Sequence, residues 1–425
     1  MSLTKKQVAE FAFDIQNGVG RTDIPDFDIL RNVGMAASLA VHIRGLGEID
    51  YEVLRKVSDH YFDIHSFALP NVLTILAELE FIQLITSTTK IKKVIPQVPK
   101  FQDIYEIIGN YPNLGDFNEH EQAILAILGE LYKKPDNKDR LLNTIGIEPE
   151  VFNRCLTIGS TGGFIREHRA REKTILVSPY YFADNLNSLA DIVAKNGASE
   201  IEKVLNFIRN HQGWPLSLIE QQSEIGGIKL NNLQKSLITT LASEGVLKPP
   251  TITFSNRTES FIFTPHPGSS RLNASNRETY ERAMALVSSV RKGQLLPDLY
   301  KIRSPLQILE ALKNKGYLKS NSEANVQYKN LVVLKVAYLK QIGNSRWQLH
   351  LHETQENLDA LNLAINILRT GEISNMEVNQ EARIALSKDE KYIQSIIASK
   401  ELRVRKKQEI DEQTALEFEK LILSY

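Results

Sequence analysis

The 425-residue sequence has a single cysteine, Cys155, and no excess of either charge, since 51 lysines and arginines stand against 51 aspartates and glutamates. One cysteine excludes an intramolecular disulfide and a zinc site built from several cysteines, and it favours a reducing compartment. A net charge of zero excludes a uniformly basic nucleic-acid-binding surface and an acidic disordered protein. Any affinity for nucleic acid must therefore come from a local patch.

Long apolar runs are also missing. Nowhere do about 18 uncharged apolar residues follow one another, so we expect neither a transmembrane helix nor a membrane partner. The N-terminus carries Lys5 and Lys6, but Glu10 and Asp14 interrupt the segment where a signal peptide would have its apolar core. These absences favour a soluble, cytoplasmic protein.

Several chemical motifs are absent too. The sequence has no G-x-x-x-x-G-K-[ST] phosphate loop, no H-E-x-x-H zinc motif and no glycine-rich turn of a dinucleotide site. Cys155 falls on an apolar helical face, where a core residue is expected rather than a nucleophile. His350 and His352 alternate on one predicted strand beside Glu353, as part of a metal site or, with no third ligand placed by sequence, of a solvated strand face. We therefore expect no metal, no cofactor and no enzymatic activity.

What the sequence does contain is a repeated pattern of amphipathic helical segments followed by a short step into β-rich residues. The four steps align on Glu80–Ile82, Gly163–Ile165, Gly245–Leu247 and Gly316–Leu318. Their spacings, by subtraction of these residue numbers, are 83, 82 and 71 residues. A near-constant period indicates related units in tandem.

The third copy shows the pattern most clearly. A first helix is predicted from the spacing of Ile201, Val204, Leu205 and Ile208, and a short helix from Leu216–Gln222. After a turn at Glu224–Gly227, a further helix carries Leu230, Leu233, Leu237, Ile238 and Leu241 on one face and ends at Gly245. Two β-rich runs follow, Thr251–Ser255 and Ser260–Thr264. Three helices followed by a hairpin resemble the winged helix-turn-helix domain class.

This resemblance implies a mainly α fold with small β-hairpin wings, made of tandem winged helix-turn-helix units plus a helical C-terminal extension. We place an N-terminal helix and unit 1 in residues 1–110, unit 2 and a connecting helix in 116–195, unit 3 in 200–267, unit 4 in 277–353 and the extension in 354–425. The strongest boundary is His266–Asn276, which contains proline, glycine and serines. In unit 4 we expect strands at Leu331–Tyr338 and Arg346–His352.

The resemblance also implies a mode of DNA binding, with the third helix in the major groove and the wing along the backbone or minor groove. The wing of unit 2 has the most cationic tip, and its candidate DNA-binding residues are Arg166, His168, Arg169, Arg171 and Lys173, with Arg154 on the preceding helix. Guanidinium groups suit phosphates because they bond two oxygens at once. In unit 3 the candidates are Asn231, Asn232 and Lys235 on the third helix and Arg257 on the wing.

Units 1 and 4 look less suited to DNA. The exposed third-helix residues expected in unit 1 are Asn71, Thr74 and Glu78, without a positive charge, and unit 4 offers Lys301, Arg303 and Lys313 together with Glu310. We expect protein partners to bind through units 1 and 4 or the C-terminal helices. The basic run Lys400–Lys407 either binds phosphates or an acidic partner, or is a solvated helical face.

The leading hypothesis from sequence is a non-catalytic protein that binds double-stranded DNA mostly through phosphates, with tandem units that combine their affinities. The alternative is a protein-interaction subunit of a larger nucleic-acid-related complex, in transcription, chromosome maintenance or antiphage defence. The neutral overall charge favours this alternative, because dedicated DNA-binding proteins are often basic.

Overall fold

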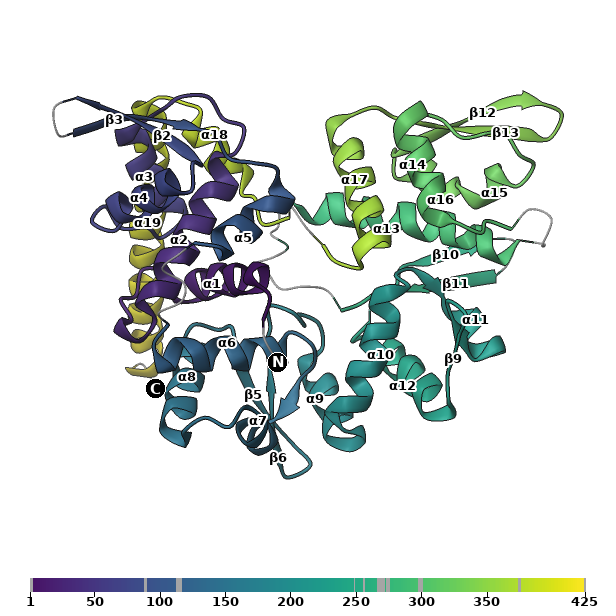
Figure 1. Ribbon diagram of the computed structural model, residues 1–425, viewed down its shortest axis with the longest axis horizontal. Coiled ribbons are helices and arrows are strands. Elements are labelled where there is room, and N and C mark those ends of the chain that lie inside the picture. The colour runs from purple at the N-terminus through teal and green to yellow at the C-terminus, as the bar shows by residue number, and fades with distance from the viewer. Residues whose placement is uncertain are drawn as a thin grey trace. The chain divides into compact units, whose positions relative to one another are not determined.

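The computed structural model describes residues 3–87, 90–111, 117–247, 249–254, 257–265, 272, 276–296, 301–373 and 376–423. It is mainly helical and has small antiparallel sheets of two or three strands (Figure 1), so the predicted mainly α architecture with small β-hairpins is confirmed at that level. The chain divides into two compact bodies. The central body comprises Phe117–Val378 with Met1–Leu3, and the terminal body comprises Thr4–Asp116 with Asn379–Tyr425.

The terminal body contains the first repeat. Its elements are α1 (Lys5–Val19), η1 (Pro25–Phe27), α2 (Asp28–Ile43), β1 (Ile49–Asp50), α3 (Tyr51–Tyr61), α4 (Leu69–Glu78), β2 (Ile82–Ser87), β3 (Lys90–Pro96) and α5 (Phe101–Gly109). The sheet order β1-β3-β2 pairs the short strand before α3 with the returning strand of the hairpin. The alanine- and leucine-rich α2 is buried along most of its length, because α1, α4 and α5 pack around it.

The second repeat opens the central body. Its elements are α6 (Glu119–Leu131), β4 (Asp136–Asn137), α7 (Lys138–Ile145), α8 (Pro149–Thr161), β5 (Arg166–Ala170) and β6 (Lys173–Val177). The sheet order β4-β6-β5 repeats the arrangement of the first sheet, and α8 begins at Pro149, a residue that the first helical position favours. The predicted connecting helix follows as α9 (Leu186–Asn196).

The third repeat has the same order of elements with one added hairpin. It contains α10 (Ala198–Asn210), β7 (Trp214–Pro215), α11 (Leu216–Gln222), β8 (Glu224–Ile225), β9 (Ile228–Lys229), α12 (Asn232–Ser243), β10 (Thr251–Phe254) and β11 (Arg257–Ile262). Gly226 and Gly227 have positive φ angles of 58° and 88°, which a two-residue hairpin turn needs. Leu233, which the spacing places on the same helical face as Leu237, Ile238 and Leu241, is 45% exposed, whereas those three residues are buried.

Parts of the third repeat's predicted surroundings lie outside the described residues. These are the end of the first predicted strand at Ser255, the turn residue Asn256, and residues 266–271 and 273–275 of the predicted linker.

The fourth repeat differs most from its prediction. It contains α13 (Arg277–Lys292), η4 (Gly293–Leu295), α14 (Pro305–Lys315), α15 (Ala324–Gln327), α16 (Lys329–Val333), β12 (Ala337–Gly343) and β13 (Arg346–Leu351). The predicted strand Leu331–Tyr338 is wrong over its first half, because residues 331–333 complete α16 and the strand begins at Ala337. Two isolated bridges, Tyr317 to His350 and Asn321 to Trp347, stand where the other repeats have a short strand.

All four repeats share the step that joins the third helix to the hairpin. Glu80, Gly163, Gly245 and Lys335 each have a positive φ angle. The next residue then donates its N–H to the carbonyl five positions back: Phe81 to Leu76 at 2.8 Å, Phe164 to Gly159 at 3.0 Å, Val246 to Leu241 at 3.0 Å and Val336 to Leu331 at 2.9 Å. The predicted alignment of the fourth copy on Gly316 is therefore wrong, because Gly316 caps α14, which precedes α15 and α16 in that repeat. The spacings become 83, 82 and 90 residues.

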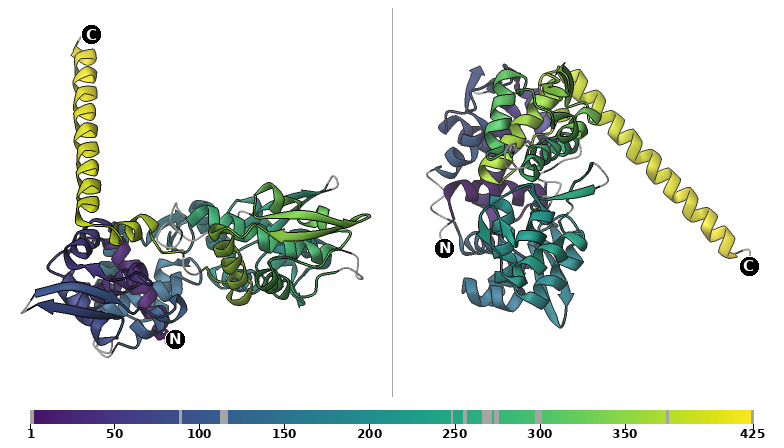
Figure 2. Two further views of the ribbon diagram at one scale, coloured as in Figure 1. Left: turned by 90° about the horizontal axis from the view of Figure 1, so that it is seen from above. Right: turned by 90° about the vertical axis from the view of Figure 1, so that its right-hand side faces the viewer.

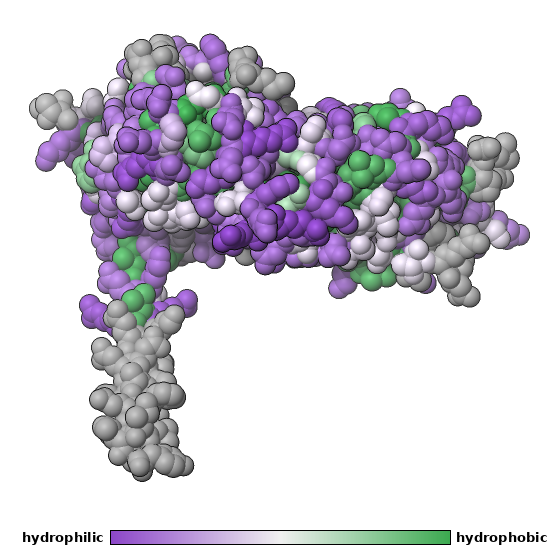
Figure 3. Space-filling view, turned by 90° about the horizontal axis from the view of Figure 1, so that it is seen from below, coloured by the Kyte–Doolittle hydropathy of each residue, from purple (hydrophilic) through white to green (hydrophobic). Residues whose placement is uncertain are grey.

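The residues after the fourth repeat are mainly helical, and the two bodies share them. α17 (Gln355–Thr370) packs against α13 and α14 in the central body. α18 (Gln380–Leu386) and α19 (Glu390–Leu423) pack against α3 in the terminal body, and α19 runs for 34 residues as one helix (Figure 2). None of the described helices combines the length and apolar character that crossing a bilayer requires. The face drawn in Figure 3 is mainly hydrophilic, with small separate hydrophobic areas.

Candidate nucleic-acid interface

The wing of the second repeat is a hairpin with a two-residue turn at Arg171 and Glu172, whose φ angles are 50° and 63°. The predicted charged tip is therefore mostly strand. Because side chains alternate along a strand, Arg166 and His168 lie on one face of the hairpin and Arg169 lies on the other.

Two of the predicted wing residues, Arg171 and Lys173, form hydrogen bonds to α9. Arg171 forms two hydrogen bonds to Asp191 on α9, at 2.8 and 3.2 Å, and these bonds lower the pKa of the Asp191 carboxyl. Lys173 donates through Nζ to the carbonyl of Ala194 at 3.2 Å, and Nε2 of His168 is buried. The bonds of Arg171 and Lys173 hold the wing against α9.

The other arginines are directed to solvent. Arg166 and Arg169 are exposed, and neither side chain forms an ion pair or hydrogen bond with another described residue. Glu167, which lies between them, pairs with Lys138 at 3.1 Å. Arg154 is exposed on α8.

α8 presents a continuous polar stripe. Its exposed polar residues are Glu150, Asn153, Arg154, Thr157, Ser160 and Thr161. They recur at intervals of three or four residues, so they share one face of the helix. An amide, a guanidinium and hydroxyl groups on one helical face supply the donors and acceptors that recognition of base edges requires.

Two of the candidate DNA-binding residues in the third repeat, Asn231 and Lys235, form hydrogen bonds within the protein. Asn231 is the N-cap of α12, where it accepts from the N–H of Gln234 at 2.8 Å, and the Gln234 side chain accepts from the N–H of Asn231 at 3.1 Å. Lys235 donates to the carbonyl of Glu220 at 2.6 Å and to Ser223. Asn232 is exposed. The side chain of Arg257 lies outside the described residues.

A charge excess in the fourth repeat was missed at the sequence level. Between residues 301 and 353 there are nine basic residues against three acidic ones, a net charge of +6. The basic residues, all exposed, are Lys301, Arg303, Lys313, Lys315, Lys319, Lys329, Lys335, Lys340 and Arg346. None forms an ion pair with a described residue, whereas Glu310 is paired with Arg369 at 2.7 Å. By comparison, residues 117–195 hold ten basic against eleven acidic residues.

A row of aromatic rings follows the hairpin of the same repeat. The ring of His350 lies 5.6 Å from that of Tyr317 and 5.1 Å from that of Tyr338, which in turn lies 5.0 Å from the ring of His352. The planes of Tyr338 and His350 differ by 14°, so these two rings are stacked. His350 and His352 thus take part in ring contacts, and the described residues hold no cluster of three His, Cys, Asp or Glu side chains suited to a metal.

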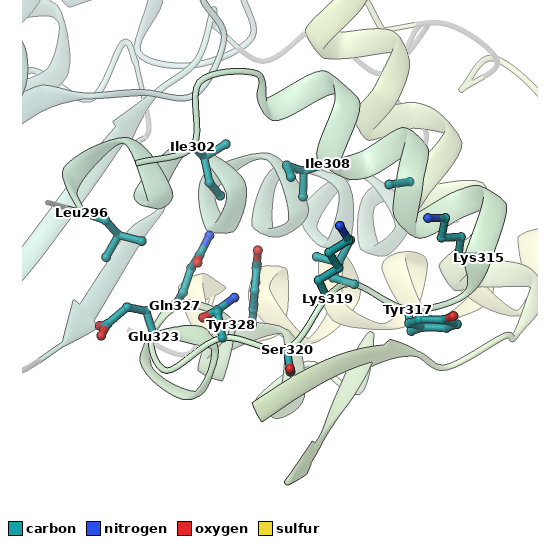
Figure 4. A pocket seen from close by; sticks show the side chains of 13 residues that line it. Leu296, Ile302, Ile308, Lys315, Tyr317, Lys319, Ser320, Glu323, Gln327 and Tyr328 are labelled. Atoms are coloured by element: carbon teal, nitrogen blue, oxygen red, sulfur yellow. The ribbon is translucent and has the colours of Figure 1, made fainter. Parts of the chain in front are cut away.

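A cavity of about 450 Å³ lies beside this row (Figure 4). Its lining includes Leu296, Ile302, Ile308, Leu318 and Tyr328, together with Lys315, Tyr317 and Lys319. In Figure 4 the side chains of Ile302, Ile308 and Lys319 point into the same space. Two lysines and Tyr317 therefore meet at one edge of a largely apolar hollow.

A second cavity, of about 320 Å³, lies in the terminal body. Both of its arginines are paired, Arg21 with Asp63 at 3.0 Å and Arg31 with Asp23 at 3.2 Å. The prediction that Cys155 belongs to the core is confirmed, since it is buried on α8.

Units 1 and 4 expose apolar residues near their third helices. In the first repeat Phe67 is 79% exposed just before α4, and Lys90 and Lys92 are exposed on β3. In the fourth repeat the exposed residues are Val326, Val332, Val333 and Leu334, of which Val333 is 69% exposed. Of the basic run on α19, the side chains of residues 400–406 are exposed and that of Lys407 lies outside the described residues.

No protein-family model matches the chain, and neither does any curated protein. The candidate interfaces therefore stand on their geometry and charge.

Proposed function

We propose that the four repeats are winged helix-turn-helix units and that the chain binds double-stranded DNA without catalysis, mainly through phosphate contacts. The order helix, short strand or bridge, two helices and hairpin in every repeat supports this interpretation. The observation that carries the DNA proposal is the second repeat, where the polar stripe of α8 accompanies the exposed arginines of β5.

In this proposal α8 enters the major groove. Asn153 and Arg154 contact base edges, because an amide pairs with adenine and a guanidinium with guanine. Arg166 and Arg169 bind phosphates, which fixes the position of the unit on the duplex. Arg171 and Lys173 position the wing through α9 instead of binding DNA.

A second function is supported by a separate observation. The exposed Val326, Val332, Val333 and Leu334 lie on and beside α15 and α16, where a DNA-binding winged helix would carry polar side chains. Clustered exposed apolar residues are typical of protein–protein contacts. On this basis the chain is also an assembly subunit, with a protein partner bound at the fourth repeat.

The DNA proposal is tested by the salt dependence of binding. Fluorescence anisotropy with a labelled duplex would compare the wild type with the double variant Arg166→Gln, Arg169→Gln. Each lost phosphate contact makes the slope of log K against log salt shallower by about 0.9, so the double variant is expected to lose about 2.

Arg171→Gln is the matched control, because this arginine is also exposed on the wing but is paired with Asp191. It should leave the slope unchanged. The proposed surface is wrong if the wild type shows no salt-dependent binding, or if the control loses as much as the double variant.

A further inference from the structure

The fourth repeat concentrates unpaired positive charge on one small domain. Its nine exposed basic residues face only three acidic ones, and one of these, Glu310, is already neutralised by Arg369. Such an excess attracts a polyanion, and this attraction is lost as salt rises. The other repeats lack this excess of basic residues, which indicates a separate binding role for the fourth repeat.

The basic residues of the fourth repeat lie beside aromatic rings on which planar ligands can stack. Tyr317 and Tyr338 are 43% and 42% exposed, and with His350 and His352 they form the row of rings on the β12–β13 hairpin. Lys340 lies two residues from Tyr338 on the same strand and so on the same face. Lys315 and Lys319 flank Tyr317 along the chain and line the same cavity edge.

We propose that this hairpin face binds single-stranded nucleic acid, with bases against the rings and phosphates against Lys315, Lys319 and Lys340. Unpaired bases stack on aromatic side chains while a basic groove follows the backbone, and this combination needs no particular base sequence. The site is independent of the duplex site proposed for the second repeat.

Two other polyanions fit less well. A duplex keeps its bases stacked inside, so it leaves the rings without a partner, and the third helix α16 exposes Val332 and Val333 instead of groove-reading side chains. An acidic protein segment would satisfy the lysines but not the rings. The alternation of charge and planar groups in a single strand matches both features.

Glu353 provides a further test of this site, because it is an acidic residue next to the row of aromatic rings. It follows His352, and its carboxylate lies beside Gly316, within 2.7 Å of where a β-carbon on that glycine would be. Its negative charge opposes phosphate, so Glu353→Gln should tighten binding of a single strand.

The experiment measures anisotropy of a labelled oligothymidylate of about 15 nucleotides, within the usual site sizes, and of a duplex, with the full chain. Tyr338→Ala is expected to weaken oligothymidylate binding about tenfold, the loss expected from removing one stacking ring. Tyr338→Phe keeps the ring and should bind like the wild type. Lys340→Gln should make the salt slope shallower by about 0.7.

The double variant Arg166→Gln, Arg169→Gln separates the two sites, because it should weaken duplex binding and leave oligothymidylate binding unchanged. Tryptophan fluorescence, to which Trp347 on β13 contributes together with Trp214, checks that each hairpin variant remains folded. The proposal is overturned if the wild type does not bind oligothymidylate, or if folded Tyr338→Ala binds it as tightly as the wild type. Equal competition by polyglutamate and by unlabelled oligothymidylate would assign the face to an acidic protein partner instead.

Discussion

Protonation of His42 on α2 is expected to destabilise the packing of α18 in the terminal body. Its ring is buried, its Nδ1 lies 2.6 Å from the carbonyl of Ser38, and its Nε2 accepts from the backbone N–H of Asn379 at 2.9 Å. Asn379 is the N-cap of α18. Only a neutral imidazole accepts at one nitrogen while it donates at the other, so protonation would set two donors against each other.

The pKa of His42 gives the size of the effect. Burial, the main cause, and the nearby positive charge of Arg383 together lower this pKa from 6.5 to about 4, against the opposing effect of the bond to Ser38. Between pH 6.5 and about 4 the unfolded state therefore binds a proton that the folded state does not. The free energy of unfolding should fall by about 1.4 kcal/mol per pH unit as pH decreases through this window, about 3 kcal/mol in all, and His42 contributes no pH dependence above it.

Hydrogen exchange of the α18 amides between pH 4 and 7, corrected for intrinsic rates, would measure this loss. His42→Gln is the control, since its side-chain carbonyl can accept from Asn379 without titrating, and it should abolish the slope. The reasoning fails if the variant keeps the slope of the wild type, or if the ring of His42 titrates near its ordinary value by NMR.

Three further substitutions test separate features. Gly34→Ala would place a β-carbon 2.3 Å from the carbonyl oxygen of Ala12, so it should destabilise the terminal body by about 1–3 kcal/mol in urea unfolding, whereas Gly47→Ala, in open space, should have almost no effect. Asn231→Ala should cost about 1 kcal/mol of stability through the lost cap, and Asn231→Ser should restore it; a loss of DNA affinity in the stable serine variant would show that the amide contacts DNA. Burial lowers the pKa of Lys292 from 10.5 to about 8, so stability should rise with pH across this window, and Lys292→Met should remove that rise in denaturation at pH 8–10.5.

Hydrophobic periodicity predicted most helices and hairpins, because the local pattern that buries an apolar face also sets the helix. In the first repeat the β-rich residues 82–86 and 91–95 lie within β2 and β3. In the fourth repeat the step from the third helix to the hairpin was not predicted, because Lys335, not glycine, adopts the left-handed conformation there. Gly316 supplied the expected residue type two helices too early, at the end of α14 instead of α16.

The candidate interface was harder to predict, because the position of a side chain on its own helix or strand does not show which neighbouring element it binds. Arg171, Lys173 and Lys235 occupy surface positions by local spacing, yet each binds a group on a neighbouring helix. By contrast, the net positive charge of the fourth repeat can be read from the sequence by summing the charges of residues 301–353. Total charge per repeat therefore predicts more than the charge of one helix face.

The division of the chain into two bodies has a consequence for synthesis on the ribosome. The first part of the terminal body is complete at Asp116, but α18 and α19 are made only after the 262 residues that separate Asp116 from Asn379. At about 5–20 residues per second, this interval lasts roughly 10–50 s. During that time the faces of α2 and α3 that α18 covers have no partner, so the nascent terminal body is expected to depend on chaperones until its last helices emerge.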